Sequence, residues 1–147
     1  MQKTVELIVS LKVPDNTALT ALQVLHNLGF SQIKDLKRAD YYRFIFDGTI
    51  ANFKKKISKV DMIVNANKHS IDFSVKDDGS QKVLVRDMDD DGSGLIALLN
   101  SRLGIREVES VIKGVLWSFF TDNPDVASEK AVKELLSNEN YQEYSIL

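Results

Sequence analysis

The sequence contains no cysteine, only two histidines and two prolines, and no long apolar run. The absence of cysteine excludes disulfides, thiolate metal sites and a cysteine nucleophile, and it suits a reducing compartment. No stretch approaches the roughly 20 apolar residues that a membrane-spanning helix needs. The N-terminus runs directly into an alternating strand pattern, so we expect no signal peptide, no membrane association and a cytoplasmic location.

The composition is that of a folded globular protein, with 44% hydrophobic and 27% charged residues. The formal net charge of −2 is unevenly distributed along the chain. Residues 1–76 carry 12 Lys and Arg against 7 Asp and Glu, whereas residues 77–147 carry 7 against 14. Opposite signs would help the two halves to dock or would steer a charged partner. Independent sequence divergence of two related surfaces explains the difference in charge between the halves equally well.

The sequence contains an internal repeat, which indicates a duplicated structural unit. The segment Leu28-Gly29-Phe30 recurs 75 residues later as Leu103-Gly104-Ile105. Other pairs at this spacing are Ile33 and Val108, Leu36 and Val111, Tyr42 and Trp117, Phe44 and Phe119, and Asp47 and Asp122. After a length change of two residues the pairs Asn65 and Asn138, Asn67 and Asn140, Ile71 and Tyr144, and Phe73 and Ile146 continue the match. We infer two copies, residues 1–76 and 77–147, joined by a turn-forming linker at 77–80.

Hydrophobic periodicity predicts the same elements in each copy: a strand, a helix, a hairpin, a second helix and a closing strand. In the first copy these are expected at about residues 5–13, 18–28, 33–46, 50–60 and 69–75. In the second copy they are expected at about residues 83–85, 95–103, 107–121, 122–137 and 144–146. Gly29 and Gly104 stand where helix C-terminal caps belong, and Pro124 suits the first turn of a helix.

The order βαββαβ is that of the ferredoxin-like split βαβ arrangement. A single unit of about 70 residues buries only about 60% of its unfolded surface and is marginally stable. Two copies that pack against each other would bury more surface and overcome this marginal stability. The sequence therefore predicts an α+β protein of two tandem ferredoxin-like βαββαβ units, packed as an intramolecular pseudo-dimer.

Two charged motifs suggest ligands but fit them poorly. Asp87 to Gly92 matches the first six places of a calcium loop, yet place 12, which needs a bidentate Glu, is Leu98. A solvated acidic loop that caps a helix explains it better, and we expect no metal. Lys54-Lys55-Lys56 and Lys59 form the outer face of a predicted helix. Without an overall basic excess they do not indicate nucleic-acid binding.

Catalytic and cofactor motifs are not recognisable in the sequence. His26 and His69 have no acid–base partner at a recognisable spacing, and there is no glycine-rich phosphate loop. Trp117, Tyr41, Tyr42 and Phe119 are more readily explained as packing residues than as a site. We therefore predict a protein that is not an enzyme and that needs no cofactor.

The remaining candidates for binding lie in the turns before the first helices and in the first hairpin. Asp15-Asn16-Thr17-Ala18-Leu19 and Asp91-Gly92-Ser93-Gly94-Leu95 are both acidic turns of small polar residues that open a helix ending in Leu-Gly. The residues that we single out are Asp15, Asn16, Lys37, Arg38, Tyr41, Asp91, Gly92 and Gly94.

Each half resembles the small PurS subunit of formylglycinamide ribonucleotide amidotransferase over nearly its whole length. The similar features are the helix ending in Leu-Gly, the hydrophobic arm after it, the aromatic second arm, and the closing segment at 135–146. The family's hairpin carries Arg followed by Gly-Lys, where this chain has Lys37 with Ala39-Asp40 and Ile112 with Gly114-Val115. The resemblance implies a non-catalytic accessory subunit that bridges protein partners in purine synthesis, with its dimer fused into one chain.

A shorter resemblance is to the ACT regulatory module, which is also βαββαβ. Its ligand loop is similar to residues 91–95, where small residues let the backbone amides of a helix N-terminus hold an amino-acid carboxylate. The functional alternatives are thus an accessory protein that binds other proteins and a sensor that binds a small molecule. The sequence leaves open the identity of the partner or ligand and whether two chains associate.

Overall fold

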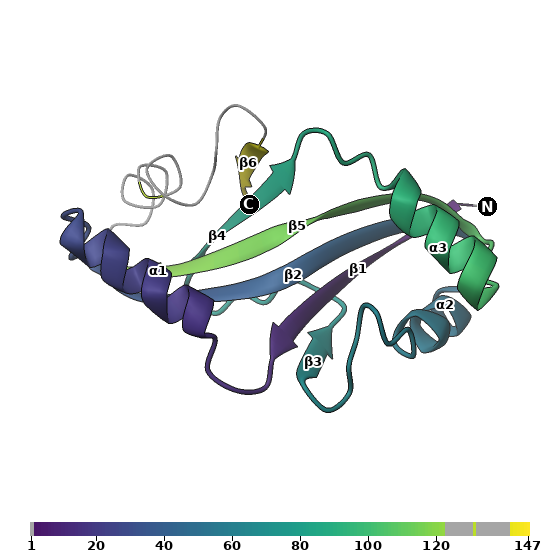
Figure 1. Ribbon diagram of the computed structural model, residues 1–147, viewed down its shortest axis with the longest axis horizontal. Helices are drawn as coiled ribbons and strands as arrows, with labels where there is room; N and C mark the ends of the chain where they lie inside the picture. Colours follow the sequence, from purple (N-terminus) through teal and green to yellow (C-terminus); the bar gives the residue numbers. More distant parts are fainter. Residues whose placement is uncertain (1, 123–130, 132–141) are drawn as a thin grey trace. The chain divides into compact units, whose positions relative to one another are not determined.

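The computed structural model describes residues 2–122, 131 and 142–147. The protein is α+β, as expected, with six strands and three helices in its described residues. The elements are β1 Gln2–Leu11, α1 Asn16–Asn27, β2 Ile33–Asp47, α2 Ile50–Ile57, β3 His69–Asp72, β4 Gln81–Asp87, α3 Ser93–Leu103, β5 Val108–Thr121 and β6 Gln142–Ile146. The strands form one antiparallel sheet in the order β3-β1-β2-β5-β4-β6 (Figure 1).

The two predicted hairpins are wrong, because residues 33–47 and 108–121 each form one long strand. A tight hairpin turn needs residues with positive φ, typically Asn-Gly or Asp-Gly. Residues 37–40, near the middle of the first stretch, contain neither glycine nor proline. Gly114 in the second copy does not have a positive φ, and a Cβ built on it would lie 2.5 Å from the Val85 carbonyl oxygen. Each stretch therefore continues as a strand, and the first copy has the element order βαβαβ.

The other predicted elements of the described residues are present, with shifted ends. The helices α1, α2 and α3 and the strands β1, β3, β4 and β6 all overlap the expected ranges. The predicted helix at 122–137 lies outside the described residues, except for Asp122 and for Ala131, which is fully buried. No helix in the described part of the chain is long and apolar enough to cross a membrane.

Contacts divide the chain into two compact units, and each unit takes three separate segments. Unit 1 comprises Met1–Lys12, Asp40–Val75 and Asp90–Lys113, and unit 2 comprises Val13–Ala39, Lys76–Asp89 and Gly114–Leu147. These units do not follow the sequence copies. Unit 1 combines β1, α2 and β3 of the first copy with α3 of the second, whereas unit 2 combines α1 of the first copy with β4 and β6 of the second.

The core of unit 1 lies on one face of β1 and β2. Val5 pairs with Phe44 and Leu7 with Tyr42, so alternate residues of both strands point the same way. The rings of Phe46 and Phe53 stack with their centroids 4.1 Å apart. From the second sequence copy, α3 adds Leu99, which is fully buried, and Figure 1 shows α2 and α3 near the N-terminal end of β1.

The core of unit 2 forms between α1 and strands of the second copy. Its fully buried members include Leu25, Val83 and Phe119. Asp15 caps α1 by accepting hydrogen bonds from the backbone N–H groups of Thr17 and Ala18 at 3.0 and 3.2 Å. Helix α1, from the first sequence copy, thus packs on strands from the second copy.

Candidate functional site

Four of the predicted binding residues belong to unit 2, and the structure joins two of them directly. Arg38 Nε donates to Asp15 Oδ2 at 2.9 Å, so the cap of α1 is also held by β2. Lys37 is exposed, and its Nζ lies 5.3 Å from the centroid of the Phe120 ring. Asn16 is the exposed first residue of α1. These contacts account for Asp15 and Arg38 as structural partners.

Asp91, Gly92 and Gly94 belong to unit 1, in the loop before α3. The N–H of Gly92 donates to Asp90 Oδ1, and that of Ser93 donates to Asp91 Oδ1, each at 2.9 Å. The Gly92 N–H lowers the pKa of the Asp90 carboxyl, and the Lys113 ammonium at 3.2 Å adds to the effect. The Ser93 side chain, together with the Ser93 N–H, lowers the pKa of the Asp91 carboxyl. The described residues contain no cluster of three or more metal-ligating His, Asp or Glu side chains. The loop's own carboxylates thus occupy two of the amides of residues 91–95, those of Gly92 and Ser93.

Tyr41 is buried in unit 1 and serves as a hydrogen-bond donor. Its hydroxyl donates to Glu6 Oε2 at 2.5 Å across β1 and β2. Burial, together with this hydrogen bond, raises the pKa of the Tyr41 hydroxyl. Tyr41 is therefore protonated at neutral pH, and it fixes the position of the Glu6 carboxylate.

A groove lies beside that carboxylate. It has a volume of about 440 Å³ and is lined by Thr4, Val5, Glu6, Arg43, Ile50, Lys54 and Phe73, all of unit 1. Thr4, Val5 and Glu6 are consecutive on β1 and point alternately to opposite faces of the sheet. A groove that contacts all three must follow the edge of the strand. We call it the β1 groove.

The edge of β1 is unpaired beside this groove. β3 pairs with β1 only from Ile8 to Leu11, and no described strand pairs with that edge of residues 2–7. Figure 1 shows β3 alongside only the C-terminal end of β1. The N–H of Lys12 donates to Lys68 O at 2.9 Å on this side, and hydrogen-bonding residues alternate along a strand. The backbone groups of Gln2, Thr4 and Glu6 therefore point to the open edge.

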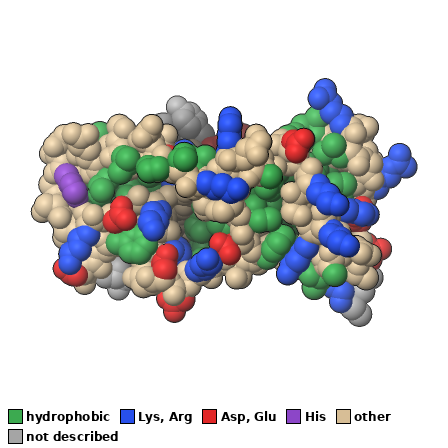
Figure 2. Space-filling model, turned by 90° about the horizontal axis from the view of Figure 1, so that it is seen from below, with side chains coloured by type: hydrophobic (Ala, Val, Ile, Leu, Met, Phe, Trp, Pro, Cys, Tyr) green, Lys and Arg blue, Asp and Glu red, His purple; other side chains and the backbone are tan. Residues whose placement is uncertain are grey.

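Positive charge predominates around the β1 groove. Arg43 is exposed, and no ion pair joins it or Lys54 to a carboxylate of the described residues. Lys54 Nζ lies 4.8 Å from the centroid of the Phe73 ring. Figure 2 shows Lys and Arg side chains gathered over the α2 side of the molecule. Glu6, the one carboxylate of the lining, already accepts the Tyr41 hydroxyl.

Unit 2 contains a separate polar cluster around the buried Lys82. Its Nζ donates to Asp78 Oδ1 at 2.9 Å, to Ser80 Oγ at 2.5 Å and to Ser118 Oγ at 3.0 Å. Burial disfavours ionisation of Asp78, but hydrogen bonds from Ser80 and Lys82 outweigh it and hold the pKa of the carboxyl well below its ordinary value. The cluster attaches the segment before β4 to the sheet.

This cluster predicts a pH-dependent part of the stability. Because the folded-state pKa of Asp78 is lowered, its stabilisation is complete above the unfolded pKa of about 4 and is lost as pH falls toward the folded pKa. We expect Asp78→Asn to lower the urea midpoint at pH 7, with the difference from wild type shrinking by pH 3. Asp77→Asn, at the exposed neighbouring position, is the control and should track wild type. An Asp78→Asn deficit that is unchanged at pH 3 would contradict this assignment.

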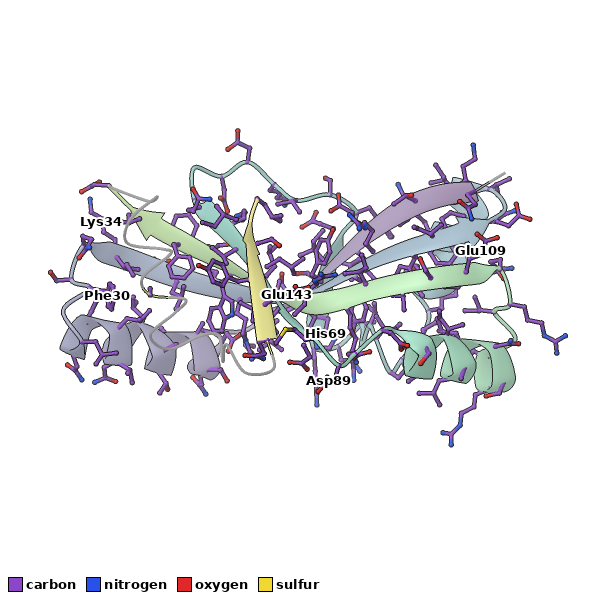
Figure 3. All side chains as sticks on the ribbon, turned by 90° about the horizontal axis from the view of Figure 1, so that it is seen from above. Phe30, Lys34, His69, Asp89, Glu109 and Glu143 are labelled. Carbon is purple, nitrogen blue, oxygen red and sulfur yellow. The ribbon has the colours of Figure 1, made fainter. Side chains whose placement is uncertain are left out.

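Both histidine rings contact the backbone. His26 Nε2 lies 2.6 Å from Ile33 O, to which it donates, and His69 Nδ1 accepts the N–H of Asn65 at 3.0 Å. His69 is the first residue of β3 (Figure 3). Near the start of β2, Lys34 projects toward solvent, and its Nζ lies 3.0 Å from Asp122 Oδ2 (Figure 3). Neither histidine forms a nucleophile–base pair with the hydrogen-bond partners that it has here.

Sequence reasoning missed the β1 groove. The first and closing strands were expected to be similar in length, at about 5–13 and 69–75, whereas β1 has 10 residues and β3 has 4. That difference in length creates the open edge, and no motif marks it. No protein-family model matches the sequence, and no curated protein matches it either.

Proposed function

We propose that the protein is a non-catalytic accessory protein that acts by binding other proteins, in the manner of the PurS subunits that its sequence resembles. The observation that carries this proposal is the open edge of β1 beside the β1 groove. An unpaired strand edge presents a row of N–H and C=O groups that another chain can pair with. Function in purine synthesis rests on the resemblance alone.

We further propose that each unit is a ferredoxin-like module assembled from both sequence copies. Unit 1 supports this when its elements are taken as β1, α3, the start of β5, the end of β2, α2 and β3. In that order the neighbouring strands β3-β1-β2-β5 are fourth, first, third and second, which is the split βαβ arrangement. The continuous long strands support such an exchange, because β2 and β5 are each divided between the two units.

The test is recovery of a partner from native lysate by the tagged full-length protein. We expect a defined protein to be retained in stoichiometric amount and to be identified by mass spectrometry. Recovery of no such protein at any salt concentration would contradict the accessory role. Turnover of a substrate by the purified protein alone would contradict the non-catalytic part of the proposal.

The sensor alternative stays a prediction, and no contact among the residues that the structure describes favours it. A ligand present at 100 times its dissociation constant stabilises a protein by about 2.7 kcal/mol, which a thermal-shift screen of amino acids and nucleotides detects. The N–H groups of Gly92 and Ser93, at the N-terminus of α3, already donate to the Asp90 and Asp91 carboxylates.

A further inference from the structure

We propose that the β1 groove binds an extended, acidic segment of a partner protein, which adds to β1 as a strand in line with β3. This inference rests on the proposed function and specifies the chemistry of the partner. Strand addition to a free sheet edge is a recurring mode of peptide recognition, in which backbone hydrogen bonds give affinity and flanking pockets give specificity.

The length and orientation of the open edge fit this occupant. Six residues of β1, from Gln2 to Leu7, extend beyond the last pair with β3, and at about 3.3 Å per residue they offer an edge roughly 20 Å long. Pairing between β1 and β3 ends at Ile8 and Asp72, and the next residue, Phe73, lines the groove beside the open edge. The outward backbone groups of Gln2, Thr4 and Glu6 are spaced as one strand requires.

Side chains on both sides of the edge define what the added strand should carry. Ile50 and Phe73 supply apolar surface on the side of α2, where Lys54 also lies. Arg43 lies on the opposite face, since it pairs with Glu6 and neither belongs to the face that holds Phe44. A strand projects alternate side chains to the two faces, so carboxylates on each side would meet Arg43 and Lys54. A basic strand would be repelled by both.

A random peptide library displayed on phage is the probe for selection against the full-length protein. We expect enrichment of acidic sequences of high strand propensity and without proline. A selected peptide added to ¹⁵N-labelled protein should shift the amide resonances of Gln2, Thr4 and Glu6 more than those of α1. Selection of basic or helical peptides, or no selection, would overturn the proposal, as would shifts confined to other residues.

Two variants and one matched control separate backbone pairing from charge. Thr4→Pro removes an outward N–H, a position where proline is tolerated in an edge strand. Lys54→Glu reverses a groove charge, and Lys55→Glu makes the same change on the exposed neighbouring residue of α2, outside the groove lining. We expect each groove variant to weaken peptide binding about tenfold, as loss of one strong hydrogen bond would, and the control to bind as wild type. Equal weakening by Lys55→Glu would show general attraction only and would overturn the proposal.

The same variants distinguish the two levels of the proposal. If lysate partners are retained by Thr4→Pro and Lys54→Glu as well as by wild type, strand addition at β1 is wrong, while the accessory role stands. If selected peptides bind the groove but no protein is retained from lysate, strand addition stands and the accessory role loses its support. If Thr4→Pro dissociates a dimer of the chain in solution, the occupant is a second copy, and the acidic-partner proposal is overturned.

Discussion

Leu25→Ala should change the fluorescence spectrum of Trp117, and Leu99→Ala should not. Both leucines are fully buried on helices, and Trp117 is the only tryptophan of the chain. Leu25 shares the unit 2 core with the indole, whereas Leu99 belongs to the unit 1 core. Each substitution should lower the free energy of unfolding by about 3 kcal/mol, because it leaves a cavity where a leucine side chain was packed.

The pair of variants tests the exchange of segments between sequence copies. If residues 1–76 and 77–147 each formed their own core, Leu99 would be the residue next to Trp117, and Leu99→Ala would change the native emission spectrum. The emission maximum in buffer, compared with urea unfolding followed by circular dichroism, separates a local effect on the indole from a general loss of stability. A spectral change in Leu99→Ala with none in Leu25→Ala would refute the described packing.

Gly92→Ala should be among the most destabilising single substitutions in the chain. Gly92 has a φ of +82°, which costs a residue with a side chain about 1–2 kcal/mol. A Cβ at this position would lie 2.3 Å from the Val111 carbonyl oxygen, so backbone must move. The two effects together should lower the free energy of unfolding by about 4 kcal/mol, measured by urea denaturation.

Gly94→Ala is the matched control, because it lies in the same loop-to-helix segment. Nothing lies within 4 Å of a Cβ built on Gly94, and the residue is already helical. We expect a stabilisation of about 0.5–1 kcal/mol from the better helix propensity of alanine. Gly92→Ala with the stability of wild type would show that the close approach of this loop to β5 is wrong.

Local features of the fold could be predicted from the sequence, and pairing between distant segments could not. Alternation of Val5, Leu7 and Val9 identified β1, and Gly104 correctly marked the end of α3, where its φ is +67°. These signals act over a few residues. The two hairpin predictions were wrong for a different reason. The alternating pattern of a strand is the same whether it turns back or continues, and only turn chemistry decides between the two.

The same difference between local signals and pairing of distant segments applies to the candidate sites. The acidic turn at Asp15 was recognised, but its role as cap and as partner of Arg38 depends on β2 lying beside α1. Tyr41 was singled out among the aromatics, whereas its hydrogen bond to Glu6 follows from the register of β1 and β2. The β1 groove depends on where β3 stops pairing. Registers and strand ends of this kind are set by tertiary packing, which a single sequence does not display.

The division of each unit into three segments also governs how the chain can fold during its synthesis. A nascent chain that has emerged as far as residue 76 contains α1 but none of β4 or β5, on which α1 packs. Unit 1 includes residues as late as Lys113, and unit 2 includes β4, the end of β5 and β6. The apolar face of α1 therefore stays exposed until β4 and β5 have been synthesised, so we expect this chain to depend on chaperone protection more than a protein whose first domain closes early.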